Sequence, residues 1–133
     1  MAIILDSGVI PGGERGTVDL ERWLASRPSQ EFEVAALTVA ELWHGVERAT
    51  AKHRMKRQTY LENALRVVRI IPYTEQTARI RARLWAQLES SGRKIGDYDL
   101  IVAATAIERG CAVATFNRSH FSVVKGLKVI ELA

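Results

Sequence analysis

The sequence predicts one α/β domain built around a mostly parallel β-sheet, and three observations favour this fold class. Short apolar runs with many β-branched residues, typical of strands, recur along the 133 residues. Longer stretches with helical spacing of their apolar residues separate these runs. The early strands are mostly apolar throughout, as expected of a sheet that is covered on both faces. No linker, repeat or low-complexity tract divides the chain, so residues 1–133 are expected to form a single domain.

The expected elements follow one another in an alternating order. Strands are expected at "AIIL" 2–5, "FEVAAL" 32–37, "VVRII" 67–71, "AVATF" 112–116 and "LKVIEL" 127–132. Helices are expected at 18–26, 38–49, 53–68, 74–92 and 97–110. In the second of these helices the i, i+3, i+4, i+7 rule is followed by Val39, Leu42, Trp43 and Val46. The third helix and the third strand overlap at 67–68, where the pattern leaves the boundary open.

The composition is that of an ordinary globular protein, with 47% hydrophobic and 26% charged residues. No apolar stretch approaches the roughly 20 residues that a membrane span needs. Met1 leads directly into "AIIL" without a basic region or a cleavage site, so we expect a cytoplasmic protein. The single cysteine, Cys111, cannot form an internal disulfide and is expected to be a small buried residue.

Basic residues exceed acidic ones by nineteen to fifteen, which is compatible with a polyanionic partner. One cluster comprises Arg48, Lys52, Arg54, Lys56 and Arg57. A second comprises Arg79, Arg81 and Arg83. Each cluster alone is typical of a solvated helix face. The clusters gain meaning only if a site that handles phosphate lies nearby.

Polar residues follow several of the expected strands. In a parallel sheet, ligands bind beyond the carboxyl ends of the strands. Asp6 follows the first strand, Glu41 lies in the helix after the second, and Asn117 follows the fourth. An aspartate at the end of a strand can cap a turn, but a carboxylate at the ligand edge of the sheet also favours a functional role.

Glu41 has two interpretations that the pattern leaves equal. Thr38 and Glu41 form a T-x-x-E capping box, in which the glutamate would bond back to the start of the helix. Glu41 is equally suited to hold a metal ion, since a carboxylate oxygen is the ligand that hard cations prefer.

Two acids precede the apolar run of "GDYDLIVAATAIERG", residues 96–110. At about 100° per residue, Asp97 falls in the polar sector of the helix, where it is expected to be the N-cap. Asp99 falls in the apolar sector with Val102 and Ala106. An ionised carboxylate on that side must be paired or must hold a metal, so Asp99 is the stronger candidate for function.

Asp6, Glu41 and Asp99 would together form an anionic pocket, which Asn117 could complete with a carbonyl oxygen. Mg²⁺ or Mn²⁺ is the natural occupant, because both prefer oxygen ligands and exchange water for phosphate. Such a site suits hydrolysis of a phosphodiester by water that the metal activates.

Other chemistries find less support in the sequence. No spacing suggests a catalytic pair among the three histidines, His44, His53 and His120. Ser7 lacks a nucleophile elbow, and no glycine-rich motif for a nucleotide cofactor occurs. The three tryptophans lie at apolar helical spacings and are expected in the core or a dimer interface: Trp23, Trp43 and Trp85.

Four segments, in this order, resemble the PIN-domain ribonucleases of the VapC toxin family: "ILDSGVI", "LTVAELWHGVER", "GRKIGDYDLIVAATAIERG" and "ATFNRSHFSVVKGLKVI". The resemblance covers nearly the whole chain. It implies a three-layer α/β/α PIN domain, an endoribonuclease dependent on Mg²⁺ or Mn²⁺, and the toxin of a type II toxin–antitoxin pair. It also implies an RNA substrate, a homodimer, and inhibition by a VapB-type antitoxin.

The family's acidic positions fall on Asp6, Glu41 and Asp99, and its fourth position falls on Asn117. The resemblance therefore implies that Asp6 and Asp99 are the principal metal ligands, that Glu41 binds metal or orients water, and that Asn117 supports them. Two departures stand out. Gly8 replaces a side chain that the family commonly has, and Asn117 removes one negative charge, which disfavours tight binding of a second metal ion. A site with one metal ion would suffice to activate water, and the sequence leaves the number of metal ions open.

Two functions of other classes remain as alternatives. Ser7-Gly8 and Asn117 are compatible with a non-catalytic module that binds phosphate, RNA or a partner protein. A receiver-type signalling domain with Asp6 as phosphoacceptor fits less well, because no lysine follows a later strand where that class needs one.

Overall fold

A computed structural model describes residues 1–132 of the chain. In this range five strands form one parallel sheet in the order β3-β2-β1-β4-β5. The strands are β1 (Ala2–Leu5), β2 (Glu31–Ala35), β3 (Arg69–Ile71), β4 (Ala112–Thr115) and β5 (Val129–Glu131). All five lie within or next to the expected runs, and the prediction of a mostly parallel sheet is confirmed.

Seven helices connect and flank the strands in the described residues. They are α1 (Val9–Arg15), α2 (Leu20–Ala25), α3 (Ala36–Glu47), α4 (Ala51–Leu65), α5 (Glu75–Ser90), α6 (Asp97–Arg109) and α7 (Arg118–Phe121). The sequence pattern missed α1 and α7. Helix α1 is short and contains Pro11, Gly12 and Gly13, which are poor helix formers, and α7 is only four residues long.

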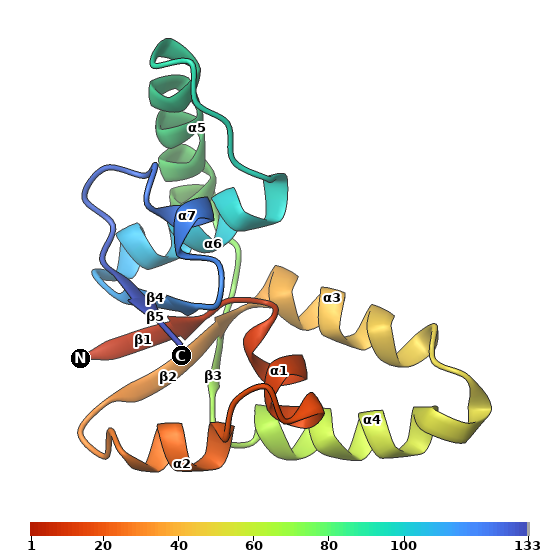
Figure 1. Ribbon diagram of the computed structural model, residues 1–133. Helices are drawn as coiled ribbons and strands as arrows, with labels where there is room; N and C mark the ends of the chain where they lie inside the picture. Colours follow the sequence, from red (N-terminus) through yellow and green to blue (C-terminus); the bar gives the residue numbers. More distant parts are fainter. Residues whose placement is uncertain (133) are drawn as a thin grey trace.

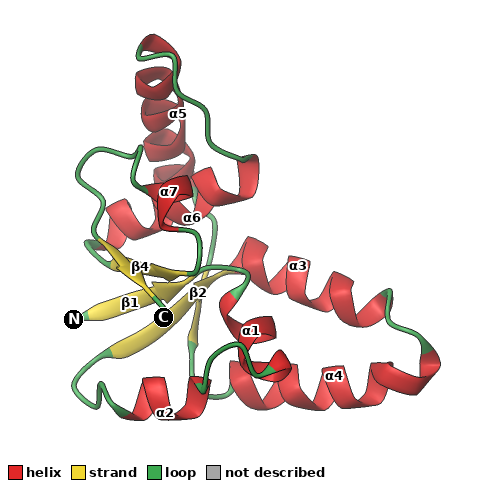
Figure 2. Ribbon diagram, viewed as in Figure 1, coloured by secondary structure: helices red, strands yellow, loops and turns green. Residues whose placement is uncertain are grey.

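The sheet lies between two layers of helices, as the α/β/α prediction required. Helices α5, α6 and α7 lie on one side and α1 to α4 on the other (Figures 1 and 2). Two hydrophobic clusters correspond to these two sides. One centres on Ile4, Val113 and Phe121, and the other on Leu5, Val34 and Leu61. Because both faces are covered, the central strands are apolar on both sides.

The boundary between β2 and α3 differs from the expectation. Residues 36–37 were expected to end the strand, but they begin α3, with Ala35 as N-cap. The strand thus passes into the helix without a loop, and the apolar run continues because the first helical turn is partly buried as well. At the third strand, residues 67–68 belong to neither the helix nor the strand.

An ion pair whose carboxylate is buried links the sheet to α6, and the sequence pattern did not predict it; the Arg109 side chain is 30% exposed. Glu33 on β2 is fully buried, and it accepts two hydrogen bonds from Arg109 at the end of α6, at 2.5 and 2.6 Å. Cys111 is buried beside them, as expected, with its Sγ 3.6 Å from Glu33 Oε1. The carboxylate is tolerated at this depth because the guanidinium satisfies both of its oxygens.

The three tryptophans do not share one environment. Trp23 and Trp43 pack against the α1–α4 side of the core, as expected. Trp85 on α5 is 50% exposed, which excludes the core and leaves the dimer interface as its predicted environment, and its ring lies beside the Arg81 guanidinium. Among the described helices, none combines the length and the apolar character that a membrane crossing requires.

Candidate functional site

Asp6 lies where β1 ends, at the edge of the sheet to which all five strands point. Its main-chain amide donates to Ala114 O of β4 at 2.9 Å, which ties the ends of the two central strands together. The side chain is buried, with 5% of the residue exposed. The Ser7 amide donates to Asp6 Oδ1 at 2.8 Å, and the Thr115 hydroxyl donates to Oδ2 at 2.8 Å. These bonds hold the carboxylate in one orientation without a cation.

Thr115 connects Asp6 to the segment after β4. Its hydroxyl is fully buried and accepts a hydrogen bond from the Asn117 amide at 2.9 Å. Since the hydroxyl has one proton, accepting from Asn117 directs that proton to Asp6. Thr115 therefore positions the carboxylate, a role that the sequence did not indicate. Its place at the end of an apolar strand was the available clue.

Glu41 lies in the second turn of α3, so the capping-box alternative is wrong. Helix α3 begins at Ala36, which places Thr38 inside the helix instead of at its N-cap, and no side-chain cap bond is present there. Glu41 Oε1 is buried and has no hydrogen-bond partner in the described residues. Burial raises the pKa of Glu41, and the charges of Asp6 and Asp99 raise it further.

Asp99 lies in the first turn of α6. As expected, its side chain and that of Asp97 lie in different environments. Gly96 is the N-cap of α6, so the prediction that Asp97 is the cap was wrong. The Asp97 side chain is 88% exposed and lies 3.9 Å from Arg81, whereas that of Asp99 is only 22% exposed. The two acids thus differ in environment as the helical wheel predicted.

The partner of Asp99 is His120, on α7. His120 Nδ1 lies 3.2 Å from Asp99 Oδ2. Burial raises the pKa of Asp99, the Asp6 charge raises it further, and His120 partly offsets both effects. His120 is thus a site neighbour that sequence reasoning treated as an ordinary residue, because 21 positions separate it from Asp99.

Three acids from three elements therefore come close enough to influence one another. The charge of Asp6 raises the pKa of both Glu41 and Asp99, and the charge of Asp99 raises the pKa of Glu41. Within residues 1–132, however, no three Asp, Glu, His or Cys side chains are arranged so that they could hold a metal ion as they stand. The acids are repelling neighbours without a closed ligand shell.

The donor set nevertheless fits a hard divalent cation. It consists of carboxylate oxygens, one of which, Glu41 Oε1, is buried without a donor. A cation would compensate both the repulsion and the missing partner. To bind such a cation, the side chains of Asp6, Glu41 and Asp99 would have to move closer together.

Asn117 is close to the site through its main chain rather than its side chain. The residue is exposed, it precedes α7, and its side chain makes no capping bond to that helix. Only its amide contacts Thr115. The structure thus brings Asp6, Glu41 and Asp99 together, and it connects Asn117 to Asp6 through the main-chain bond to Thr115.

Replacing Thr115 by valine is expected to weaken the binding of a divalent cation by about 10–100-fold, since partners that orient a metal ligand typically contribute that much. Valine keeps the shape of threonine but removes the proton donated to Asp6. Calorimetric titration with Mn²⁺ measures the effect, and Thr115→Ser should restore it. Thr105→Val is the matched control, because the buried Thr105 hydroxyl bonds only to Ile101 O of its own helix. Equal Mn²⁺ affinity in the Thr115→Val and wild-type proteins would contradict this role.

Comparison with known proteins gives a consistent result. The family model described as "PIN domain" matches residues 3–127. The VapC ribonuclease Y4jK of Sinorhizobium fredii is 33% identical over 138 residues, with 97% of this chain and 96% of the relative covered.

Two solved structures extend the likeness to three dimensions. VapBC2 from Rickettsia felis, solved with a DNA fragment from its promoter, has a TM-score of 0.92 at 21% identity, with both chains covered completely. VapBC-5 from Mycobacterium tuberculosis, described as a member of the VapBC family of toxin–antitoxin systems, has a TM-score of 0.75 at 30% identity. That match covers 98% of this chain and 97% of the other.

Proposed function

Because this chain belongs to the PIN-domain family, we propose that it is a metal-dependent endoribonuclease and the toxin of a type II toxin–antitoxin pair. The observation that carries the proposal is the meeting of Asp6, Glu41 and Asp99 at the carboxyl edge of the sheet. The 33% identical relative is named a ribonuclease and aligns over nearly all of this chain.

The acids have different tasks in this proposal. Asp6 and Asp99 are the principal ligands of a divalent cation, Mg²⁺ or Mn²⁺, and Glu41 completes the site. Such a cation supplies positive charge that polarises a phosphoryl oxygen and makes water a better nucleophile. Thr115 and the Ser7 amide hold the Asp6 carboxylate in place before any ligand arrives.

Glu41 is also suited to accept a proton. Its Oε1 atom has no donor within the described part of the chain, and its raised pKa brings it nearer to neutral. A carboxylate of this kind can orient an attacking water and take its proton. Asn117 is proposed to contribute its carboxamide to the substrate side of the same site.

The partner and setting follow from the family. We propose a VapB-type antitoxin as the inhibitor, since a relative that is 30% identical is described as part of a VapBC toxin–antitoxin system. A homodimer and a cytoplasmic location are part of the same proposal. So is the assignment of residues 1–133 to one PIN domain, of which the family match covers 3–127.

A non-catalytic module that binds RNA or a partner is the second candidate. It is favoured by the absence of a ready-formed metal site among the described residues and by Asn117 in place of a fourth acid. The catalytic proposal is preferred because a binding module has no need for three neighbouring carboxylates, in which the charge of Asp6 helps to raise the pKa values of both Glu41 and Asp99.

Metal removal separates the two candidates. The purified protein is expected to cleave single-stranded RNA with Mg²⁺ or Mn²⁺ present, and to lose all cleavage in EDTA, because the acids alone cannot activate water. Electrophoresis of a labelled RNA measures this, and Mn²⁺ added in excess of EDTA should restore cleavage. Cleavage that persists in EDTA would contradict the mechanism, while RNA bound but uncut at every metal concentration would favour the binding module.

A further inference from the structure

The three acids of the candidate site differ in the contacts that hold them. The Asp6 carboxylate accepts hydrogen bonds at both of its oxygens, and that of Asp99 lies 3.2 Å from His120 Nδ1. The Oε1 atom of Glu41, by contrast, is buried without a hydrogen-bond partner in residues 1–132. Glu41 is therefore the acid whose buried oxygen still needs a donor.

A second unpartnered atom lies close by in the same helix. Thr38 is in the first turn of α3 and is 1% exposed, and its hydroxyl has no hydrogen-bond partner among the described residues. A threonine within a helix can donate to the carbonyl four residues earlier. Thr105 on α6 does so, to Ile101 O at 2.8 Å, whereas Thr38 does not. Because a buried hydroxyl without a partner is unfavourable, this atom requires an explanation.

The two unpartnered atoms belong to neighbouring turns on one face of α3. Thr38 and Glu41 are three residues apart, which places both side chains on the same side of the helix. Helical side chains lean towards the N-terminus, so the Glu41 carboxylate extends back over the turn that contains Thr38. One water molecule between them would satisfy both atoms, because it can accept from the hydroxyl and donate to the carboxylate.

Resting on the proposed ribonuclease function, we propose that Thr38 is a positioning residue for Glu41 and holds its carboxylate through one buried water molecule. The Thr38 hydroxyl donates to this water, and the water donates to Glu41 Oε1. Thr38 thereby does for Glu41 what Thr115 does for Asp6 by a direct bond.

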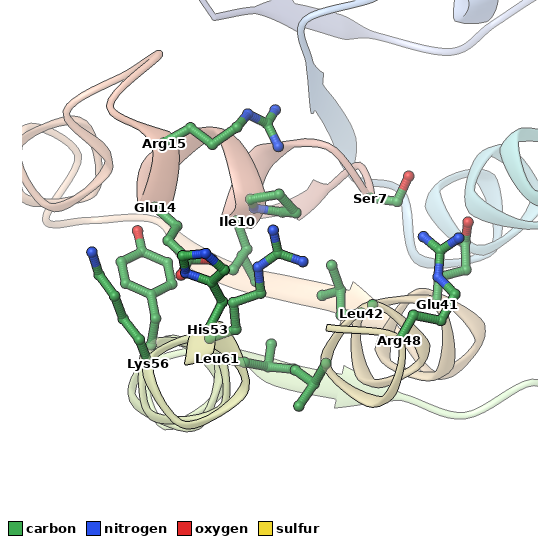
Figure 3. Close-up of a pocket in the computed structure, with 15 residues that line it drawn as sticks. Ser7, Ile10, Glu14, Arg15, Glu41, Leu42, Arg48, His53, Lys56 and Leu61 are labelled. Atoms are coloured by element: carbon green, nitrogen blue, oxygen red, sulfur yellow. The ribbon is translucent and has the colours of Figure 1, made fainter. Parts of the chain in front are cut away.

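Thr38 acts through Glu41 because it cannot reach a substrate itself. A cavity of about 480 Å³ opens between α1, α3 and α4, with Ser7 and Glu41 at one end and His53 and Lys56 at the other (Figure 3). Members of the first basic cluster also line it, namely Arg48, Lys56 and Arg57. The lining includes Glu41 but not Thr38, which is buried behind it. Loss of the Thr38 hydroxyl should therefore change kcat and metal affinity more than the KM for RNA.

Thr38→Val removes the hydroxyl and keeps the shape of the side chain. It is expected to weaken Mn²⁺ binding and to lower kcat by about tenfold each, with KM changed by less than about twofold, since partners of metal ligands contribute about 10–100-fold. Calorimetric titration with Mn²⁺ and cleavage of a labelled RNA measure these quantities. Thr38→Ser keeps the hydroxyl and should retain most of both. Thr105→Val is the matched control and should change neither, because its hydroxyl bonds only within its own helix.

A double-mutant cycle shows whether the effect passes through Glu41. In a Glu41→Ala background, Thr38→Val should change the Mn²⁺ affinity by less than about twofold, because the carboxylate that the hydroxyl positions is gone. A tenfold loss in both backgrounds would overturn the proposal, since Thr38 would then act on another group. Equal Mn²⁺ affinity and kcat in the Thr38→Val and wild-type proteins would also overturn it, while leaving the ribonuclease function standing.

Thermal unfolding of the metal-free protein gives a measurement that is independent of activity. If the water bridge exists, Thr38→Val leaves the buried Glu41 oxygen without its donor and should lower the Tm, and Glu41→Ala should abolish this difference. If the hydroxyl has no partner at all, valine should raise the Tm, and that result would overturn the proposal. A wild-type protein that neither binds Mn²⁺ nor cuts RNA would remove the ribonuclease function and this role of Thr38 together.

Discussion

The Asp99→Asn protein is expected to lose RNA cleavage by at least about a hundredfold, because groups that merely orient a metal ligand already contribute 10–100-fold. Asp99 is proposed as one of the two principal ligands, and asparagine keeps its size while removing the charge. The same expectation applies to Asp6→Asn. Cleavage of a labelled RNA at saturating Mn²⁺ measures the loss.

Although Asp99→Asn is expected to reduce RNA cleavage, it should increase the stability of the metal-free protein. Without metal, Asp99 is a half-buried carboxylate near Asp6, and both effects raise its pKa. In the native state Asp99 and Glu41 therefore bind protons more strongly than in the unfolded chain. They keep those protons at pH values above their ordinary pKa values of 3.8 and 4.5. The contribution of these two groups to the unfolding free energy of the metal-free protein is therefore lost as pH rises above about 4 and through their raised pKa values.

Asp99→Asn should remove part of this pH dependence and raise the Tm of the metal-free protein at pH 7. Divalent cation should stabilise the wild type at pH 7 more than at pH 5, and the variant little at either pH. Asp97→Asn is the matched control, since Asp97 lies two residues earlier on the same helix and its side chain is 88% exposed. If Asp97→Asn and Asp99→Asn reduce cleavage equally, the distinction between the two acids is wrong.

Arg109→Met is expected to destabilise the protein by about 3–5 kcal/mol, the usual cost of leaving one charge of a buried ion pair alone. Glu33 is fully buried, and Arg109 makes both of its strong hydrogen bonds. Methionine fills part of the space but cannot satisfy the carboxylate. Denaturant unfolding measures the change in free energy at pH 7.

A second substitution shows whether the lost charge is the cause. Adding Glu33→Gln to Arg109→Met removes the unpaired carboxylate and should recover much of the lost stability. Arg79→Met is the control, because Arg79 and Glu75 form an exposed pair whose loss should cost less than about 1 kcal/mol. A loss of similar size from Arg79→Met and Arg109→Met would show that the depth of the Glu33 pair is unimportant.

Much of the fold could be predicted from apolar patterning. All five strands and helices α2 to α6 appear where the runs place them, because burial between two helix layers demands continuous apolar strands. The predicted PIN family is confirmed by the match over residues 3–127. Helices α1 and α7 escaped prediction, since α1 contains glycines and a proline and α7 is too short to show a period.

The acidic residues of the candidate site could be predicted from the sequence, but the contacts that each of them makes could not. The helical wheel separated Asp99 from Asp97, and their exposures differ accordingly. The role of Glu41 stayed open until the start of α3 at Ala36 excluded a cap. Thr115 and His120 were missed because hydrogen bonds across 109 and 21 positions leave no periodic trace in a sequence.

By itself the sequence determined the fold class and the family, and it singled out the three acids that the structure brings together, Asp6, Glu41 and Asp99. These inferences depend on residue type and on spacing along one chain. Only the tertiary structure decided which residues share an environment. It buried Glu33 against Arg109, and it distinguished a basic cluster around a cavity from another that is partly paired on α5. The physical reason is that burial, charge pairing and repulsion depend on distances between elements, and these distances are set by packing on the two faces of the sheet.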